Sequence, residues 1–106
     1  MPEFIAVANV EDIPPGAGQT VQVQGIGIAL FNVDGTFYAV DNTCPHAGGP
    51  LGEGYLDGHV VECPWHGWRF NLQTGERPEN PAITVACCPV RVEGNQVQVA
   101  LPENFK

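Results

Sequence analysis

Glycine and proline interrupt this sequence so often that they leave little room for long helices. The chain has 13 glycines and 10 prolines among its 106 residues, and no stretch of about ten residues keeps the 3.6-residue apolar period of an amphipathic helix. Segments such as 20–24 and 96–99 instead alternate polar and apolar side chains, which is typical of half-buried strands. We therefore expect an all-β, antiparallel fold, either a small barrel or a sandwich.

Tight turns between these segments predict hairpins. Asp34-Gly35 and Asp57-Gly58 each separate two apolar runs, and Gly94 lies in a third turn of this kind. Asp-Gly is among the strongest signals for a two-residue hairpin turn. No domain linker interrupts the chain, so residues 1–106 are expected to form one domain. The predicted strands are Phe4–Val7, 20–24, Ile26–Phe31, Phe37–Val40, 55–56, His59–Glu62, Trp68–Phe70, Val90–Val92 and 97–99.

The charge of the chain excludes some classes of partner. Twelve acidic residues against four basic ones give a net charge of −8, which argues against nucleic-acid binding and against anionic membrane surfaces. The same charge favours docking to a positively charged protein. The sequence has no apolar run long enough to span a membrane, and its first residues have no positively charged region. We therefore expect a cytoplasmic protein without a membrane anchor.

Two short segments each contain one cysteine and one histidine. The first is CPHAGG, with Cys44 and His46, and the second is CPWHGW, with Cys63 and His66. Each pair follows a predicted strand, so both pairs lie on loops that can face each other at one end of a small β-fold. In a chain without an export signal, cysteines serve as metal ligands more often than as disulfide partners.

Two thiolates and two imidazoles can bind either one zinc ion or one iron–sulfur cluster. Zinc fingers usually pair cysteine with cysteine and histidine with histidine, each pair on its own segment. Here each loop contributes one residue of each type. Such a distribution suits a site with two metal ions, in which each loop sends its cysteine to one iron and its histidine to the other.

These two loops resemble the Rieske motif, and the chain as a whole resembles a soluble Rieske-type ferredoxin. The resemblance covers nearly the whole sequence, including VDGTFYAVDNTCPHAGGPL, GHVVECPWHGWRFNLQTG and PVRVEGNQVQV. It implies a [2Fe–2S] cluster in which Cys44 and Cys63 ligate one iron and His46 and His66 the other. It also implies a small Rieske-type barrel with both cluster-binding loops at one end.

The resemblance further implies a function. Such a protein is a one-electron carrier, which receives electrons from a flavin-containing reductase and passes them to a terminal oxygenase, as a monomer. Because protein side chains fill all the cluster's ligand positions, no substrate site of its own is expected. The alternative is a small Rieske subunit of a larger reductase, such as assimilatory nitrite reductase. A redox or iron sensor is a third class, and nothing specific in the sequence favours it.

The chain departs from the high-potential members of this family. Gly49 and Trp65 stand where those members have a disulfide-forming cysteine pair, and Trp68 and Phe70 stand where they have serine and tyrosine hydroxyls. With fewer donors to stabilise the reduced cluster, we predict a potential near the low end of the Rieske range, roughly −150 mV. The two tryptophans are expected either to shield the cluster or to form a docking rim.

Four other residues of interest, His59, Pro81, Cys87 and Cys88, lie outside the two Cys/His segments. His59 follows a predicted turn and is expected to be exposed rather than a ligand. Cys87 and Cys88 are adjacent, so on a strand they point to opposite faces, with Cys88 inward and Cys87 outward. A disulfide between them is not expected, since the bond would strain the backbone. Pro81 belongs either to a third loop covering the cluster or to an ordinary surface turn.

Overall fold

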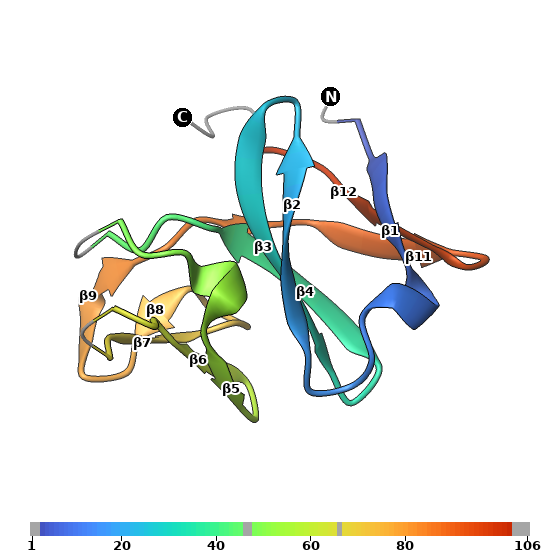
Figure 1. Cartoon of the computed structure of the whole chain (residues 1–106). Coiled ribbons are helices and arrows are strands. Elements are labelled where there is room, and N and C mark those ends of the chain that lie inside the picture. Colours follow the sequence, from blue (N-terminus) through green and yellow to red (C-terminus); the bar gives the residue numbers. More distant parts are fainter. Residues whose placement is uncertain (1–2, 46–47, 66, 103–106) are drawn as a thin grey trace.

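Antiparallel strands make up most of the chain (Figure 1). The structure is a computed structural model, which describes residues 3–45, 48–65 and 67–102. Within these ranges, no helix is long and apolar enough to cross a membrane. In chain order, the elements are β1 Ile5–Asn9, the 3-10 helix η1 Val10–Asp12, β2 Gly18–Val23, β3 Ile26–Val33, β4 Thr36–Asp41, the 3-10 helix η2 Leu51–Glu53, β5 Tyr55–Asp57, β6 Val60–Glu62, β7 Arg69–Asn71, β8 Glu76–Arg77, β9 Asn80–Thr84, β10 Cys87–Cys88, β11 Val90–Glu93 and β12 Gln96–Val99.

A central sheet with strand order β10-β4-β3-β2 organises the molecule. Its hairpin from β3 to β4 pairs Val33 with Thr36, and the turn between them has positive φ at both Asp34 (51°) and Gly35 (93°). That backbone is the one the Asp-Gly signal predicts. The β2–β3 hairpin turns in the same way through Gln24 (φ 52°) and Gly25 (φ 81°). Gln24 is therefore a turn residue and not, as predicted, the end of a strand.

The central sheet buries side chains on both of its faces. Along β3, Phe31 points to one core and Leu30 to the other, and both are fully buried. The first core, here called the loop-side core, consists of Ala29, Phe31, Val33, Val40, Cys44, Leu51, Val61, Cys63, Phe70, Leu72 and Val85. The far core consists of Ile13, Val21, Val23, Ile28, Leu30, Phe37, Ala39, Cys88, Val97 and Val99.

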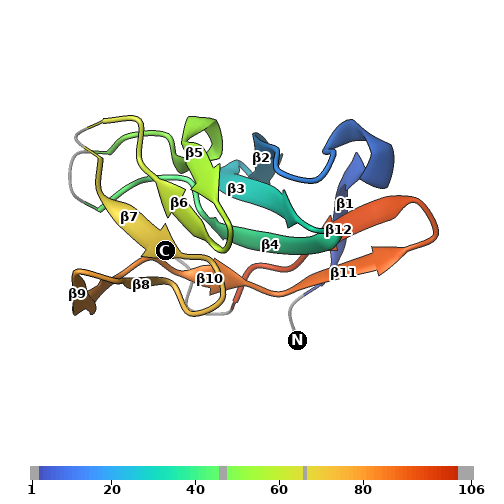
Figure 2. The ribbon, with the colours of Figure 1, turned by 90° about the horizontal axis from the view of Figure 1, so that it is seen from below.

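Smaller sheets cover these cores. A three-stranded sheet of order β1-β12-β11 contributes to the far core, and a sheet of order β5-β6-β7 contributes to the loop-side core. The two-stranded β8–β9 hairpin lies beside β7. Seen from below, the segments on either side of residues 46–47 and 66 lie at one end of the molecule, and the β11–β12 hairpin lies at the other (Figure 2).

The predicted all-β antiparallel fold with both Cys/His segments at one end is confirmed. The predicted strands agree with the observed ones to within about two residues at their ends. The β8–β9 hairpin was not predicted, because its sequence, ERPENPAIT, is polar and rich in proline and does not alternate clearly. Pro81 lies within β9.

The prediction for Cys87 was wrong in one respect. The two cysteines of β10 do point to opposite faces, since Cys88 lies in the far core and Cys87 packs against the loop-side core. Cys87 is nevertheless half-buried rather than turned to solvent. A Cβ at Gly75 would lie 3.0 Å from its Sγ, so the chain segment just before β8 covers this side chain.

Candidate metal centre

The first Cys/His segment forms a tight loop closed by backbone hydrogen bonds. An isolated β-bridge joins Thr43 to Pro50. Inside it, the N–H of Cys44 donates to the carbonyl of Gly49 (2.9 Å), and the N–H of Gly48 donates to the carbonyl of Cys44 (2.8 Å). Gly48 has a φ of 77°, a conformation that glycine adopts without steric cost. The loop thereby holds the Cys44 side chain inside the loop-side core, where it is 1% exposed.

The base of this loop is fastened to the central sheet by one amide side chain. Asn42 Oδ1 accepts hydrogen bonds from the hydroxyl of Thr20 (3.0 Å) and from the N–H of Gly52 (2.8 Å). The Asn42 carbonyl also accepts from the N–H of Leu51 (2.7 Å). The chain leaving the loop through η2 is therefore bound to strand β2.

The second Cys/His segment connects β6 to β7. The N–H of Cys63 donates to the carbonyl of Trp68 (2.7 Å), which closes the loop. Within it, Gly67 has a φ of 74°. The N–H of Trp65 points back and lies 3.4 Å from Cys63 Sγ. A backbone donor aimed at a sulfur stabilises negative charge on that sulfur, as in iron–sulfur sites.

The two loops bring their cysteines together. A Cβ added at Gly49 would lie 2.7 Å from Cys63 Sγ and 3.1 Å from the Cβ of Trp65. Burial raises the pKa of the Cys63 thiol, the hydrogen bond from Trp65 opposes this effect, and the neighbouring Cys44 raises the pKa further. Two adjacent buried thiols become thiolates only if a positive ion balances their charge. The described donors therefore fit a metal centre.

The two predicted histidine ligands, His46 and His66, lie outside the described residues. Within the described ranges, no group of three or more histidine, cysteine or acidic side chains lies close enough together to hold a metal ion. His59 is exposed, as predicted, and its ring makes an edge contact with Tyr38 (centroids 5.7 Å apart, 83° between planes).

The two tryptophans beside the second loop differ in exposure. Trp65 is 50% exposed, whereas Trp68 packs against the loop-side core. The shielding role therefore suits Trp68, and Trp65 remains available at the surface. Trp65 and Gly49 also occupy neighbouring positions, as the two places of a disulfide must.

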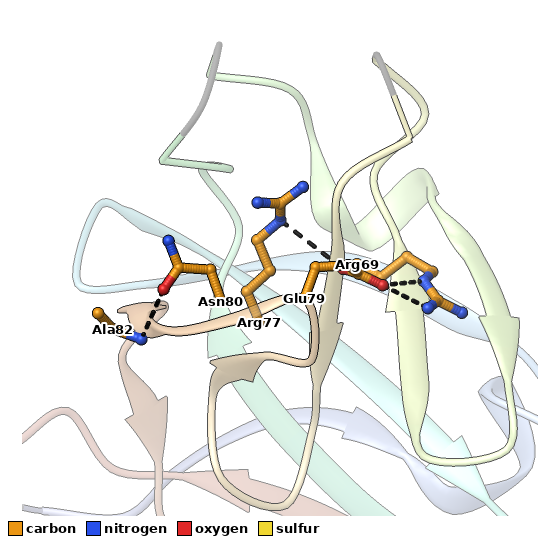
Figure 3. Close-up of polar contacts among 5 residues, drawn as sticks. All are labelled: Arg69, Arg77, Glu79, Asn80 and Ala82. Atoms are coloured by element: carbon orange, nitrogen blue, oxygen red, sulfur yellow. Dashed lines mark hydrogen bonds and ion pairs between the residues drawn. The ribbon is translucent and has the colours of Figure 1, made fainter.

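The unpredicted β8–β9 hairpin adds charged groups beside the second loop. The guanidinium of Arg77 stacks on the ring of Trp68, with its carbon 3.9 Å from the ring centroid. The Glu79 carboxylate lies between two arginines: it accepts from Arg69 Nε (3.0 Å), and its other oxygen lies 3.7 Å from Arg77 Nε (Figure 3). The bond to Arg69 lowers the pKa of Glu79 and raises that of Arg69. Sequence patterns gave no signal for the stacking of Arg77 on Trp68.

The family model of the Rieske [2Fe-2S] domain matches residues 3–97. The chain belongs to the Rieske family. Its cofactor is accordingly a Rieske [2Fe–2S] cluster, of the kind with two cysteine and two histidine ligands, rather than zinc.

Similar proteins indicate which type of Rieske protein this chain is. The chain is 39% identical, over 91% of its length and 90% of the relative's, to the biphenyl dioxygenase ferredoxin subunit of Pseudomonas sp. strain KKS102. A solved complex of reduced oxygenase and oxidised ferredoxin in carbazole 1,9a-dioxygenase contains a chain with a TM-score of 0.84 and 36% identity, with 92% of each chain covered. This Rieske chain is therefore an electron-transfer protein of the ferredoxin type and not itself a catalytic enzyme.

Another solved structure relates to the alternative function. It is named as a putative NADH-dependent nitrite reductase small subunit from Mycobacterium tuberculosis, with a TM-score of 0.89 and 27% identity over 96% of this chain and 97% of that one. The Rieske fold is thus shared closely by both groups, but the sequence is more similar to the dioxygenase ferredoxins.

Proposed function

We propose that this chain carries single electrons from a flavin-containing reductase to a terminal oxygenase. The observation that carries the proposal is the pair of buried thiols, Cys44 and Cys63, which two tight loops bring together at one end of the molecule. Similarity to dioxygenase ferredoxins along nearly the whole chain supports this role. The complex of an oxygenase with a similar ferredoxin supports an oxygenase as the electron acceptor.

We assign the cluster ligands to Cys44, Cys63, His46 and His66, with both sulfurs on one iron and both imidazoles on the other. When bound, such a cluster supplies one-electron redox chemistry. Cys44 and Cys63 each hold a sulfur inside the apolar loop-side core, which excludes water from that side of the site. The N–H of Trp65 donates to Cys63 Sγ and stabilises its negative charge. With four protein ligands, no coordination position is left for a substrate.

The ligand assignment is tested by metal analysis and spectroscopy of the purified protein. We expect iron and acid-labile sulfide in equal amounts, a brown colour and, after reduction with dithionite, the low average g-value of a mixed His/Cys-ligated cluster. Cys44→Ser, Cys63→Ser, His46→Ala and His66→Ala should each lose this signal. Cys87→Ser, Cys88→Ser and His59→Ala are the matched controls and should keep it. A colourless protein that contains zinc would overturn the assignment.

The electron acceptor is tested by single-turnover reoxidation. Dithionite-reduced protein is mixed with the terminal oxygenase encoded nearest to its own gene, and the return of the oxidised spectrum is followed. Rapid reoxidation supports the proposal. Stoichiometric co-purification with a siroheme-containing large subunit would instead support the role of a nitrite reductase small subunit, whose solved relative is less similar in sequence.

We further propose that the chain is one Rieske domain over residues 1–106, monomeric and cytoplasmic. The family match over residues 3–97 supports the domain assignment. The net charge of −8 opposes self-association. Size-exclusion chromatography with light scattering tests the monomer, a single unfolding transition tests the domain, and fractionation of the native cells tests the location. A dimer, two transitions or a periplasmic fraction would each contradict the corresponding part.

A further inference from the structure

Arg77 is the most enclosed of the arginines in the described ranges. The chain has only four basic residues against twelve acidic ones. The side chain of Arg77 is 21% exposed, whereas Arg69 and Arg91 are 46% and 49% exposed. Its Nε atom is buried and has no hydrogen-bond partner among the described residues. A positive charge held in this way interacts more strongly with its surroundings than an exposed one, because water screens it less.

Two contacts fix this charge beside the second loop. The guanidinium stacks on Trp68 at 3.9 Å from the ring centroid, and a cation over an indole ring is attracted to its face. The carbonyl of Trp68 in turn accepts from the N–H of Cys63. One aromatic residue therefore separates the guanidinium from the backbone of a cysteine that we assign as a cluster ligand.

The nearby carboxylate offsets the charge only in part, because one carboxylate faces two arginines. Glu79 Oε1 lies 3.7 Å from Arg77 Nε, beyond hydrogen-bond distance, and the other oxygen, Oε2, accepts hydrogen bonds from Arg69 (Figure 3). The two Nε contacts thus place Glu79 closer to Arg69 than to Arg77. Arg77 extends from β8 toward the end of the molecule that carries the two Cys/His segments (Figure 3).

We propose that Arg77 is a positioning residue that raises the reduction potential of the cluster, with its charge fixed next to the second loop by Trp68. Reduction adds one negative charge to the cluster, and a fixed positive charge stabilises the more negative state. The inference rests on the proposed cluster ligands. Arg77 itself lies in a part of the chain that neither the Cys/His motif nor the predicted strands indicated.

The test is the midpoint potential of the loaded protein in four variants. At a fixed ambient potential, Arg77→Gln should lower the ratio of reduced to oxidised cluster roughly five-fold, or about 40 mV at 59 mV per tenfold for one electron. Arg77→Lys keeps the charge and should recover most of this ratio. Arg69→Gln and Arg91→Gln remove one positive charge each and serve as matched controls, because their side chains are more exposed.

Varying the ionic strength distinguishes a local effect of Arg77 on the midpoint potential from an effect of the protein's net charge. The difference between the wild type and Arg77→Gln should persist from about 0.05 M to about 1 M NaCl, whereas any shift in the two controls should disappear. Two results would overturn the inference. One is an equal shift of the midpoint potential in Arg77→Gln and Arg69→Gln, and the other is a ratio of reduced to oxidised cluster in Arg77→Gln within about two-fold of the wild type.

A further variant keeps the test decisive if Arg77→Gln fails to hold its cluster. Glu79→Gln leaves both arginines in place and removes the carboxylate nearest to Arg77. Glu79→Gln should raise the ratio of reduced to oxidised cluster, whereas Arg77→Gln should lower it. The inference fails if Glu79→Gln does not raise this ratio. EPR and visible circular dichroism verify that each variant carries the same cluster. A wild type without a Rieske spectrum would instead refute the ligand assignment itself, so the two failures are distinguishable.

Discussion

Gly49 in the first loop lies directly against Cys63 Sγ in the second, and a Cβ at Gly49 would come within 2.7 Å of that sulfur. Glycine is needed here for space rather than for backbone freedom, since a positive φ is found at Gly48 and not at Gly49. The two loops can approach closely only because this position has no side chain.

Gly49→Ala should therefore force the two loops apart. The Cβ would also lie 3.0 Å from Cγ of Trp65, and overpacking of this kind costs about 1–3 kcal/mol. We expect the variant to bleach several-fold faster than the wild type when a chelator is added, measured by visible absorbance. Gly27→Ala is the matched control, because its nearest neighbours would be at 3.6 Å. Equal bleaching rates in the two variants would contradict the steric argument.

Asn42 should be required for holding the first loop to the sheet. Asn42→Ala removes the acceptor for both the Thr20 hydroxyl and the Gly52 N–H, and an unsatisfied buried donor costs about 1–3 kcal/mol. We expect a lower midpoint of thermal unfolding and faster loss of the cluster. Thr20→Val removes only one donor and should have the smaller effect. The prediction fails if the two variants are equally stable.

The reduction potential itself is predicted to lie near the low end of the Rieske range, roughly −150 mV. Phe70 is fully buried in the loop-side core and Trp68 stacks against Arg77, so neither position offers a hydroxyl to the cluster. Within the described ranges, the backbone group that donates to Cys63 Sγ is the N–H of Trp65. Spectroelectrochemical titration measures the potential, and a strongly positive value would contradict this account.

Cys88 should be a poor nucleophile in the folded protein. Burial, with smaller effects from Cys87 and Asp41, raises the pKa of its thiol to about 12 from a usual 9.0. Only the thiolate reacts, so at about pH 8 iodoacetamide should alkylate Cys88 at least a hundred-fold more slowly in the folded than in the unfolded protein. Peptide mass spectrometry at several times measures this. Similar rates in the two states would show that the strand opens.

The same shift makes stability depend on pH. Between pH 9.0 and about 12 the Cys88 thiol ionises in the unfolded chain but not in the folded one, so the free energy of unfolding falls as the pH rises through this range. Below it, both states keep the proton and Cys88 contributes no pH dependence. Urea unfolding at several pH values measures this decline, and Cys88→Ala should make it shallower. Burial also raises the pKa of the Cys87 thiol, and Cys87→Ala should make the decline shallower by a smaller amount.

Local signals predicted the strands and turns well because most of them act over two to six residues. Asp34-Gly35 adopts the positive φ values that its composition predicts. The Cys/His motif predicted that two distant loops meet, and the contact between Gly49 and Cys63 agrees with it. Gln24-Gly25 forms a turn of the same kind as Asp34-Gly35, and Gly25 is the local signal in the sequence that marks the end of β2.

Long-range packing could not be predicted in the same way. The cover over Cys87 comes from Gly75, and the stacking of Arg77 on Trp68 depends on where the β8–β9 hairpin lies beside β7. Neither relationship leaves a periodic trace in the sequence, because each depends on a few side chains from separate segments. The burial of both faces of β3 could not be predicted from alternation of polar and apolar residues either, because a strand buried on both faces does not alternate.

The placement of both Cys/His segments at one end has a kinetic consequence. The molecule measures 36 Å along its longest axis, and the β11–β12 hairpin occupies the opposite end (Figure 2). On the proposed ligand assignment, the protein that donates an electron and the protein that accepts it would both dock at this end and would compete for it. Turnover then requires release from one partner before docking to the next, and contacts that bind either partner too tightly would slow the whole chain of transfers.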